Sequence, residues 1–76
     1  MVRVDVLWGD DDGTPRIVPG TLEDRSTRGV CVRMKNPVRV GTMVTIKWGS
    51  EQFSGTVKNC RRQRTEYVLG VNRNDK

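Results

Sequence analysis

Residues 24–29, which read DRSTRG, hold a carboxylate, hydroxyl groups, two guanidinium groups and a glycine within six positions. The Asp24 carboxylate could accept two hydrogen bonds from the ring and exocyclic N–H groups at one edge of guanine. Ser26 could bond a base or a phosphate oxygen, while Arg25 and Arg28 could bind phosphate or stack on a purine face. The segment therefore has side chains suited to a guanine nucleotide.

The same segment is also typical of an ordinary turn. Asp24 and Ser26 would then hydrogen-bond their own backbone, and Gly29 would supply a positive φ. In the ligand-binding interpretation, Gly29 instead lets backbone approach closely. The residue types alone leave both interpretations open.

The charge of the chain is distributed unevenly. Its 76 residues carry 14 Lys and Arg against 9 Asp and Glu, for a net charge of +5. Residues 1–24 hold two basic and six acidic side chains, a net charge of −4, whereas residues 25–76 hold 12 basic and 3 acidic ones, a net charge of +9. The basic part could collect phosphates on a nucleotide or a polymer, or could be a solvated basic surface.

The composition disfavours several classes of protein. Without histidine, the usual zinc ligand sets, the commonest general base and the Ser–His and Cys–His nucleophile pairs cannot be assembled. Cys31 and Cys60 form no CxxC pair, and we expect two reduced thiols. The sequence predicts a protein that is not an enzyme and has no metal site or cofactor. With no secretory signal or long apolar stretch, we expect a cytoplasmic protein without membrane insertion.

Apolar side chains recur with the period of two that is typical of half-buried β-strands. Val4 and Val6 alternate with polar neighbours near the N-terminus, and Val30, Val32 and Met34 do so further along. Turn-forming residues separate such runs, and no stretch has a sustained helical period. The pattern predicts six strands, at residues 2–8, 15–23, 29–35, 42–48, 51–59 and 66–72.

Six short strands joined by brief turns favour an all-β fold, a small antiparallel barrel in one domain at residues 1–76. Closing the sheet removes edges that so small a sheet can hardly tolerate. Pro19 cannot donate a ladder hydrogen bond, so the second strand should be an edge or carry a bulge, and the barrel could be open there. We expect Trp8 and Trp48 to pack in the core and residues 73–76 to be a frayed end.

The order of these elements resembles a PilZ domain, a bacterial module whose best-known members bind cyclic di-GMP. Residues 24–29 fit its D-x-S-x-x-G motif, and the following GVCVRM has the glycine and alternating apolar residues of the next strand. Gly41 then precedes a strand, and strands like those at residues 53–57 and 67–71 follow in the same order. The resemblance covers nearly the whole chain and implies a six-stranded antiparallel barrel.

The resemblance further implies that Asp24 and Ser26 read guanine, while an R-x-x-x-R element before the first strand grips the phosphates and stacks on the guanines. Arg3 suits the second arginine of that element, but the first would fall before Met1. If Arg3 were the first arginine instead, its partner would fall at Leu7, which cannot bind phosphate. The ligand-binding residues expected on this basis are Arg3, Asp24, Arg25, Ser26, Arg28 and Gly29.

Three other features invite functional interpretations. The RRQR run at residues 61–64 is the densest basic cluster, in a turn expected at residues 61–65, and could contact nucleic acid or be a solvated hairpin loop. The three aspartates at residues 10–12 lack the spacing and closing Glu of a calcium loop, which favours a plain acidic turn. Cys60 lies beside two arginines but has no base or resolving thiol nearby in sequence, so we expect an inert cysteine.

Three functions follow as hypotheses. The first is a cyclic di-GMP receptor whose N-terminal segment is ordered around the nucleotide and thereby signals to a partner protein or neighbouring output domain. The second, prompted by the missing first arginine, is a degenerate PilZ-like adaptor that has lost the nucleotide and acts by protein–protein contacts. The third and least favoured is a small basic barrel that binds single-stranded nucleic acid, prompted by the charge of residues 25–76.

Overall fold

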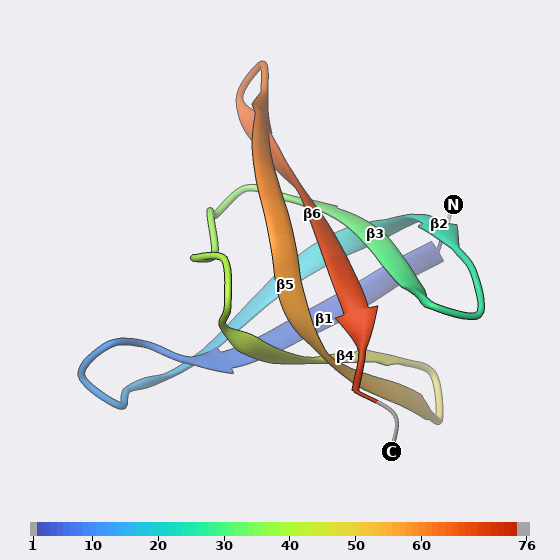
Figure 1. Ribbon diagram of the computed structural model, residues 1–76, viewed down its shortest axis with the longest axis horizontal. Coiled ribbons are helices and arrows are strands. Elements are labelled where there is room, and N and C mark those ends of the chain that lie inside the picture. The colour runs from blue at the N-terminus through green and yellow to red at the C-terminus, as the bar shows by residue number, and fades with distance from the viewer. Residues whose placement is uncertain (1, 75–76) are drawn as a thin grey trace.

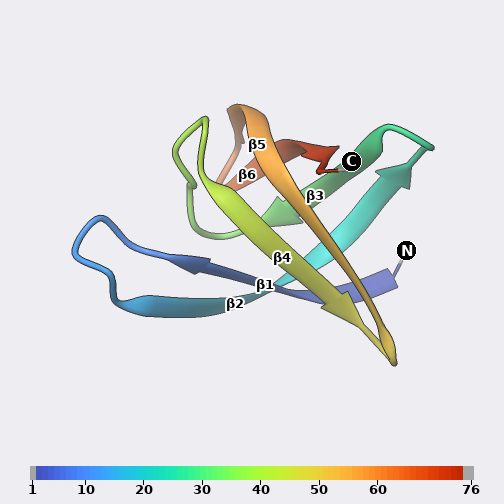
Figure 2. The same ribbon diagram turned by 60° about the horizontal axis from the view of Figure 1, so that its bottom comes forward.

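Six antiparallel β-strands close into a barrel in the computed structural model, which describes residues 2–74 (Figures 1 and 2). The strands are β1 (Val2–Gly9), β2 (Pro15–Arg25), β3 (Gly29–Met34), β4 (Met43–Trp48), β5 (Glu51–Gln63) and β6 (Glu66–Arg73). Their order around the barrel is β1-β2-β3-β6-β5-β4. The predicted all-β, six-stranded antiparallel barrel is confirmed. Within the described range there is no helix that could cross a membrane.

Inward-facing side chains of all six strands make a continuous apolar core. Successive side chains of a strand point to opposite faces, so about every second residue reaches the interior. Val6, Val32, Ile46 and Leu69 are all 0% exposed, and no polar or charged side chain of residues 2–74 is buried. The interior is therefore filled, and a binding site must lie on the outer surface or at an end of the barrel.

The two tryptophans lie at the margin of the core. Trp8, at the end of β1, and Trp48, at the end of β4, are each half-buried and pack against the core cluster. Phe53, by contrast, is buried at 4% exposure. The prediction that both tryptophans belong to the core is correct only in part, since both side chains remain partly exposed.

Pro19 lies where β2 has a free edge. β2 pairs with β1 along Pro15 to Leu22, but its pairing with β3 begins only at Gly20, opposite Met34. Proline has no N–H to offer a further strand, so the ladder with β3 cannot continue past it. The predicted edge position is confirmed. The bulge of β2 lies elsewhere, between Leu22 and Asp24, and three residue pairs between β1 and β4 complete a closed barrel rather than an open one.

β2 and β5 extend further than the sequence predicted. β2 continues to Arg25 instead of ending at residue 23, so the turn to β3 is confined to residues 26–28, while β3 begins at Gly29 as predicted. β5 continues to Gln63, which places most of the RRQR run in a strand, and the turn to β6 comprises Arg64, with φ 60°, and Thr65. Of the end expected to be frayed, Arg73 belongs to β6, and residues 75–76 lie outside the described residues.

One end of the barrel collects the elements that carry the candidate site. The start of β1, the β2–β3 turn and the β4–β5 hairpin lie together on the right of Figure 1, whereas the β1–β2 and β5–β6 hairpins project in other directions. Val2 pairs with Leu22, and the Arg73 N–H donates a hydrogen bond to the Arg28 carbonyl over 2.8 Å. The turn is thus tied to the end of β6, and β2 leads into it from beside the start of β1.

Candidate functional site

One row of paired residues crosses four strands on the outer face of the barrel. Asp24 of β2 pairs with Cys31 of β3, Cys31 pairs with Gly70 of β6, and Gly70 pairs with Asn59 of β5. At roughly 4.8 Å between neighbouring strands, the two ends of the row are about 14 Å apart along the sheet. Because the two middle residues are small, the row forms a trough between Asp24 and Asn59.

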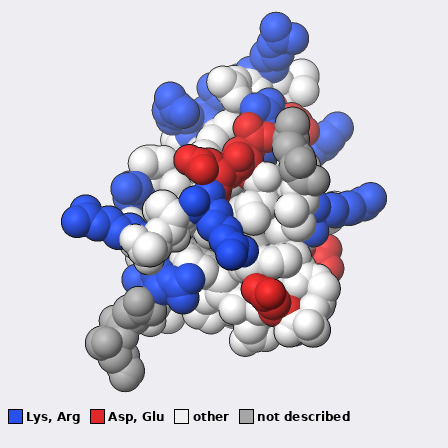
Figure 3. Space-filling view, turned by 90° about the vertical axis from the view of Figure 1, so that its right-hand side faces the viewer, with Lys and Arg blue, Asp and Glu red and all other residues white. Residues whose placement is uncertain are grey.

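This trough belongs to a hollow of about 470 Å³, called the outer hollow below. The β2–β3 turn makes one of its walls, and β5 makes the other. Figure 3 looks onto the end of the barrel that holds the turn and shows that basic side chains predominate there. The polar residues that line the outer hollow are Asp24, Arg25, Ser26, Arg28, Lys58, Asn59, Arg61 and Asn72, and glycines line it at Gly29 and Gly70.

The charge lining the outer hollow is mainly positive. Arg25, Arg28, Lys58 and Arg61 contribute four cations, against the single carboxylate of Asp24. The ion pairs found among residues 2–74 involve other cations, namely Arg16, Arg33 and Arg39. The four cations of the outer hollow are therefore not neutralised by a carboxylate within the described chain, and their field favours an anionic ligand.

Hydrogen bonds of the β2–β3 turn support the interpretation that its side chains stabilise the backbone. Asp24 Oδ1 accepts a hydrogen bond from the Arg25 N–H at 2.8 Å, and Ser26 Oγ accepts one from the Arg28 N–H at 3.3 Å. The Ser26 N–H also donates to the Gly29 carbonyl at 2.8 Å. The Ser26 hydroxyl also donates to the Gly29 carbonyl, over a long 3.5 Å. Asp24 and Ser26 are nonetheless exposed and line the outer hollow, so the remaining lone pairs of Asp24 can face a ligand, as can the Ser26 hydroxyl when it leaves this long contact.

Gly29 is required by the close approach of two strands and not by a left-handed backbone. A Cβ at this position would clash with the carbonyl oxygen of Val71 on β6 and lie 3.1 Å from its carbonyl carbon. The positive-φ glycines of the described chain are at positions 13, 41 and 49. A side chain at Gly29 would therefore push β3 away from β6 and displace one wall of the outer hollow.

Arg3 lies apart from the other expected site residues. On β1 it pairs with Thr21, and it lines two other hollows, of about 350 and 370 Å³, on the outer face of the barrel. Trp48 lines the first of these, and the Arg25 guanidinium lies over the Trp48 ring, 5.9 Å from its centroid. The structure thus brings together Asp24, Arg25, Ser26, Arg28 and Gly29, and it places Arg3 beside Trp48.

Sequence reasoning missed the residues that β5 contributes. Lys58 and Asn59 lie at an irregularity in the pairing of β5 with β6, between Val57 and Asn59, and Arg61 follows two residues later. The Asn59 Oδ1 accepts a hydrogen bond from the Gly70 N–H at 3.1 Å. No local sequence signal marks this irregularity. The nearest signal is the basic run at residues 61–64, which contains Arg61.

Cys31 lies on the floor of the outer hollow and is half-buried. Burial raises the pKa of its thiol, and the charge of Glu23 raises that pKa further, while Arg61 opposes the change. The thiol is consequently protonated at neutral pH and a weak nucleophile. Its small size is what matters for the site, because a larger side chain would fill the trough.

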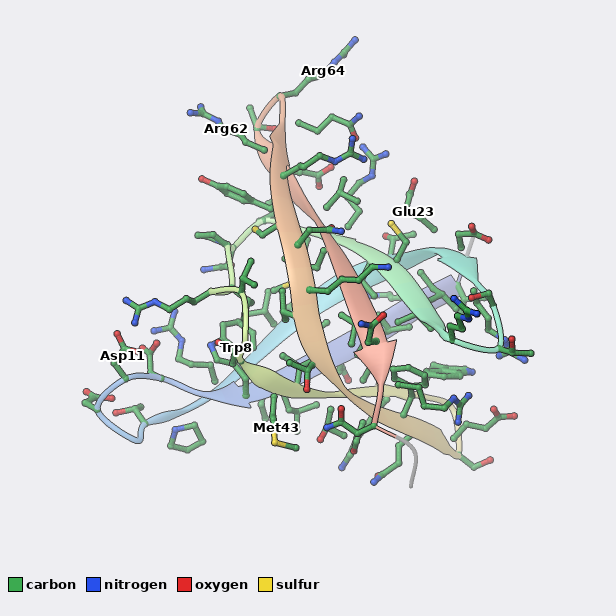
Figure 4. The ribbon with its side chains drawn as sticks, in the orientation of Figure 1. Trp8, Asp11, Glu23, Met43, Arg62 and Arg64 are labelled. Atoms are coloured by element: carbon green, nitrogen blue, oxygen red, sulfur yellow. The ribbon has the colours of Figure 1, made fainter. Side chains whose placement is uncertain are left out.

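The three aspartates at residues 10–12 form the projecting β1–β2 hairpin, where Figure 4 labels Asp11. Asp10 pairs with Arg16 at 3.1 Å and Asp11 with Arg39 at 3.2 Å. The Asp12 Oδ1 accepts a hydrogen bond from the Thr14 N–H at 2.9 Å, which lowers the pKa of the Asp12 carboxyl. Each carboxylate therefore has a role in holding the hairpin, as expected of an acidic turn.

Comparison of the chain with protein-family models and with curated proteins found no match. A function therefore has to be argued from the residues themselves and from the hollow that they line.

Proposed function

We propose that this barrel binds cyclic di-GMP in the outer hollow and acts as a regulatory module. The observation that supports the proposal is that Asp24, the only carboxylate lining the hollow within residues 2–74, shares it with four cations that have no ion pair among these residues. A carboxylate can accept the adjacent N–H groups of a guanine edge, and cations attract a dianionic ligand. The resemblance of residues 24–29 to D-x-S-x-x-G points to the same ligand.

Five residues where β2 leads into β3 have a part in this proposal. Asp24 accepts hydrogen bonds from guanine, and Ser26 bonds the base or a phosphate oxygen. Arg25 leaves the face of Trp48 to bind phosphate or stack on a purine, and Arg28 faces the same hollow. Gly29 keeps β3 close to β6, so that the turn stays at the rim of the hollow.

Binding would be coupled to the N-terminal segment through β1. Val2 pairs with Leu22, so any chain that continues β1 upstream would run toward Asp24 and Arg25. Ordering of such a segment around the nucleotide would change the surface offered to a partner protein or output domain. A ligand can drive this change only by the difference between its affinities for the two arrangements.

Calorimetric titration of cyclic di-GMP tests the proposal on this chain and on a version extended upstream. Asp24→Ala is expected to weaken binding, and Arg3→Ala to weaken it in the extended version, where Arg3 can act with upstream residues. The matched control is Asp11→Ala, because Asp11 lies in the β1–β2 hairpin, outside the outer hollow. Absence of binding by both versions up to about millimolar ligand, where binding contributes only ~4 kcal/mol, would refute the proposal.

The separation of Arg3 from the outer hollow favours a second candidate function. A PilZ-like adaptor without nucleotide would keep the barrel and act by protein–protein contacts. Ile17 and Met43, which are 66% and 63% exposed, give its surface apolar groups that a partner could cover. This candidate predicts no binding of cyclic di-GMP by either version of the chain, and specific binding of the nucleotide would refute it.

A further inference from the structure

An irregularity in β5 turns two consecutive side chains toward the outer hollow. Val57 pairs with Val71 and Asn59 pairs with Gly70, so Lys58 is an extra residue that has no partner of its own on β6. Such a β-bulge changes the direction of the side chains around it, and bulges are enriched beside functional sites. Here Lys58 and Asn59 both line the hollow, where regular alternation would turn one of them away.

The side chain of Asn59 is held in one orientation by Gly70. Its Oδ1 accepts a hydrogen bond from the Gly70 N–H. A Cβ added at residue 70 would lie only 2.7 Å from this oxygen, so the asparagine fits here because residue 70 is a glycine. Since Oδ1 is engaged in this way, the Nδ2 group keeps its two N–H donors for another acceptor. Asn59 therefore presents donors to the hollow from a fixed position.

Arg61 adds a second cation on the same side of β5. It lines the outer hollow together with Lys58, and its charge acts on the Cys31 thiol at the floor. The neighbouring Arg62 follows the alternation of the strand to the other face, and its Nε donates to the Arg64 carbonyl at 3.3 Å. Figure 4 shows Arg62 and Arg64 at the projecting tip of the β5–β6 hairpin.

We propose that Lys58, Asn59 and Arg61, together called the β5 wall, hold the phosphate of a guanine nucleotide whose base lies at Asp24. The inference rests on the proposed function and adds to it the source of the phosphate contacts. In this chain β5, at the far side of the trough, supplies phosphate contacts in addition to those open to Arg25 and Ser26, in place of an arginine pair that includes Arg3.

The distribution of charge along the trough gives the ligand one orientation. At the Asp24 end a phosphate meets a carboxylate as well as the cations Arg25 and Arg28, whereas at the β5 wall it meets two cations and an amide donor and no carboxylate. A guanine edge has the opposite requirement, because its N–H donors need the acceptor oxygens of Asp24. Between these ends the small residues Cys31 and Gly70 leave room for the remainder of the nucleotide.

The test compares Arg61→Ala with Arg62→Ala in the full 76-residue chain. These adjacent arginines are both exposed and belong to the same strand, but only Arg61 lines the outer hollow. We expect Arg61→Ala to weaken cyclic di-GMP binding by about 10- to 100-fold, the usual effect of losing a charge-assisted hydrogen bond. Arg62→Ala should stay within about twofold of the unchanged chain, and Arg61→Lys should restore part of the lost affinity.

The outcomes separate this inference from the proposed function. Suppose the unchanged chain binds cyclic di-GMP but the two alanine variants lose equal affinity, or neither loses any. The phosphate-binding role of the β5 wall is then refuted, while the proposed function stands. If the unchanged chain does not bind the nucleotide but the version extended upstream does, the same comparison of Arg61→Ala with Arg62→Ala is made in the extended version. If neither version binds, both proposals are refuted. A second readout is the change in the NMR shifts of the Lys58, Asn59 and Gly70 amides when inorganic pyrophosphate is added. If these shifts stay unchanged at pyrophosphate concentrations that move other amides, the phosphate-binding role of the β5 wall is also refuted.

Discussion

Asp24 of β2 and Asn59 of β5 lie at opposite ends of a single row of paired residues, with only Cys31 and Gly70 between them. The row places the carboxylate of the D-x-S-x-x-G-like segment opposite an asparagine that lies 35 positions further along the sequence. Because the interior of the barrel is filled with apolar side chains, polar groups can meet a ligand only at the surface, and this outer trough is one such place.

Asp24→Asn should weaken cyclic di-GMP binding without unfolding the turn. Asparagine keeps an Oδ1 that can accept the Arg25 N–H, but it replaces the second carboxylate oxygen with a donor that repels the guanine N–H groups. We expect a loss of affinity of about 10- to 100-fold, from the roughly 1.5–3 kcal/mol that a hydrogen bond to a charged group contributes. Calorimetry measures the affinity, and thermal unfolding monitored by circular dichroism should show an unchanged Tm. A large fall in Tm would instead give Asp24 a mainly structural role.

Gly29→Ala should destabilise the barrel. The added methyl group meets the Val71 carbonyl oxygen on β6, so the backbones must separate, and overpacking of this kind lowers the free energy of unfolding by about 1–3 kcal/mol. The matched control is Gly9→Ala, because a Cβ at Gly9 has nothing within 4 Å. Urea denaturation measures both variants. Equal stability of the two would contradict the close approach of β3 and β6 at Gly29.

Cys31 should react slowly with iodoacetamide, and the pH dependence of its reaction should be shifted to higher pH. In a Cys60→Ser background, the midpoint for Cys31 is expected above that of the same thiol in the urea-unfolded chain, because burial raises its pKa. Because the thiol pKa is higher in the folded chain, the protonated thiol contributes to the stability of the fold. This contribution is complete below the ordinary thiol pKa and is lost as the pH rises through the pKa of the folded chain. Alkylation at a midpoint equal to the unfolded one would refute this account.

Trp48 should report ligand binding through Arg25. In a Trp8→Phe background, cyclic di-GMP is expected to change the fluorescence of Trp48, since binding draws the Arg25 guanidinium away from the indole ring. Arg25→Ala should remove most of that change while leaving the barrel folded, because Arg25 is exposed. A ligand-induced change of the same size in Arg25→Ala would show that Trp48 responds to something else.

The fold was largely predictable because burial and strand period coincide in most of the chain. Val30, Val32 and Met34 alternate with polar residues in the sequence, and all three are buried in the barrel. The prediction failed where strands project beyond the core, as in the last residues of β5, which are exposed on both faces and so carry no alternation. There the hydrogen bonds to β6, rather than apolar burial, maintain the strand.

The site was predictable only where it is local in sequence. Asp24, Ser26 and Gly29 lie within six residues, and their chemistry together with the resemblance to D-x-S-x-x-G indicated them as candidates. Lys58 and Asn59 reach the same hollow because β6 lies between β3 and β5 in the barrel and because β5 carries a bulge. Neither strand order nor a bulge can be read from the types of neighbouring residues, so the second wall became visible only in three dimensions.

The most direct test of the central claim is an NMR titration of the uniformly ¹⁵N-labelled chain with cyclic di-GMP. The amides of Arg25, Gly29, Cys31, Asn59 and Gly70 are predicted to shift together with one dissociation constant, while those of the β1–β2 hairpin at residues 10–14 stay in place. Spectra that remain unchanged up to about millimolar nucleotide, or shifts that fall on the hairpin and not on the trough, would contradict the claim.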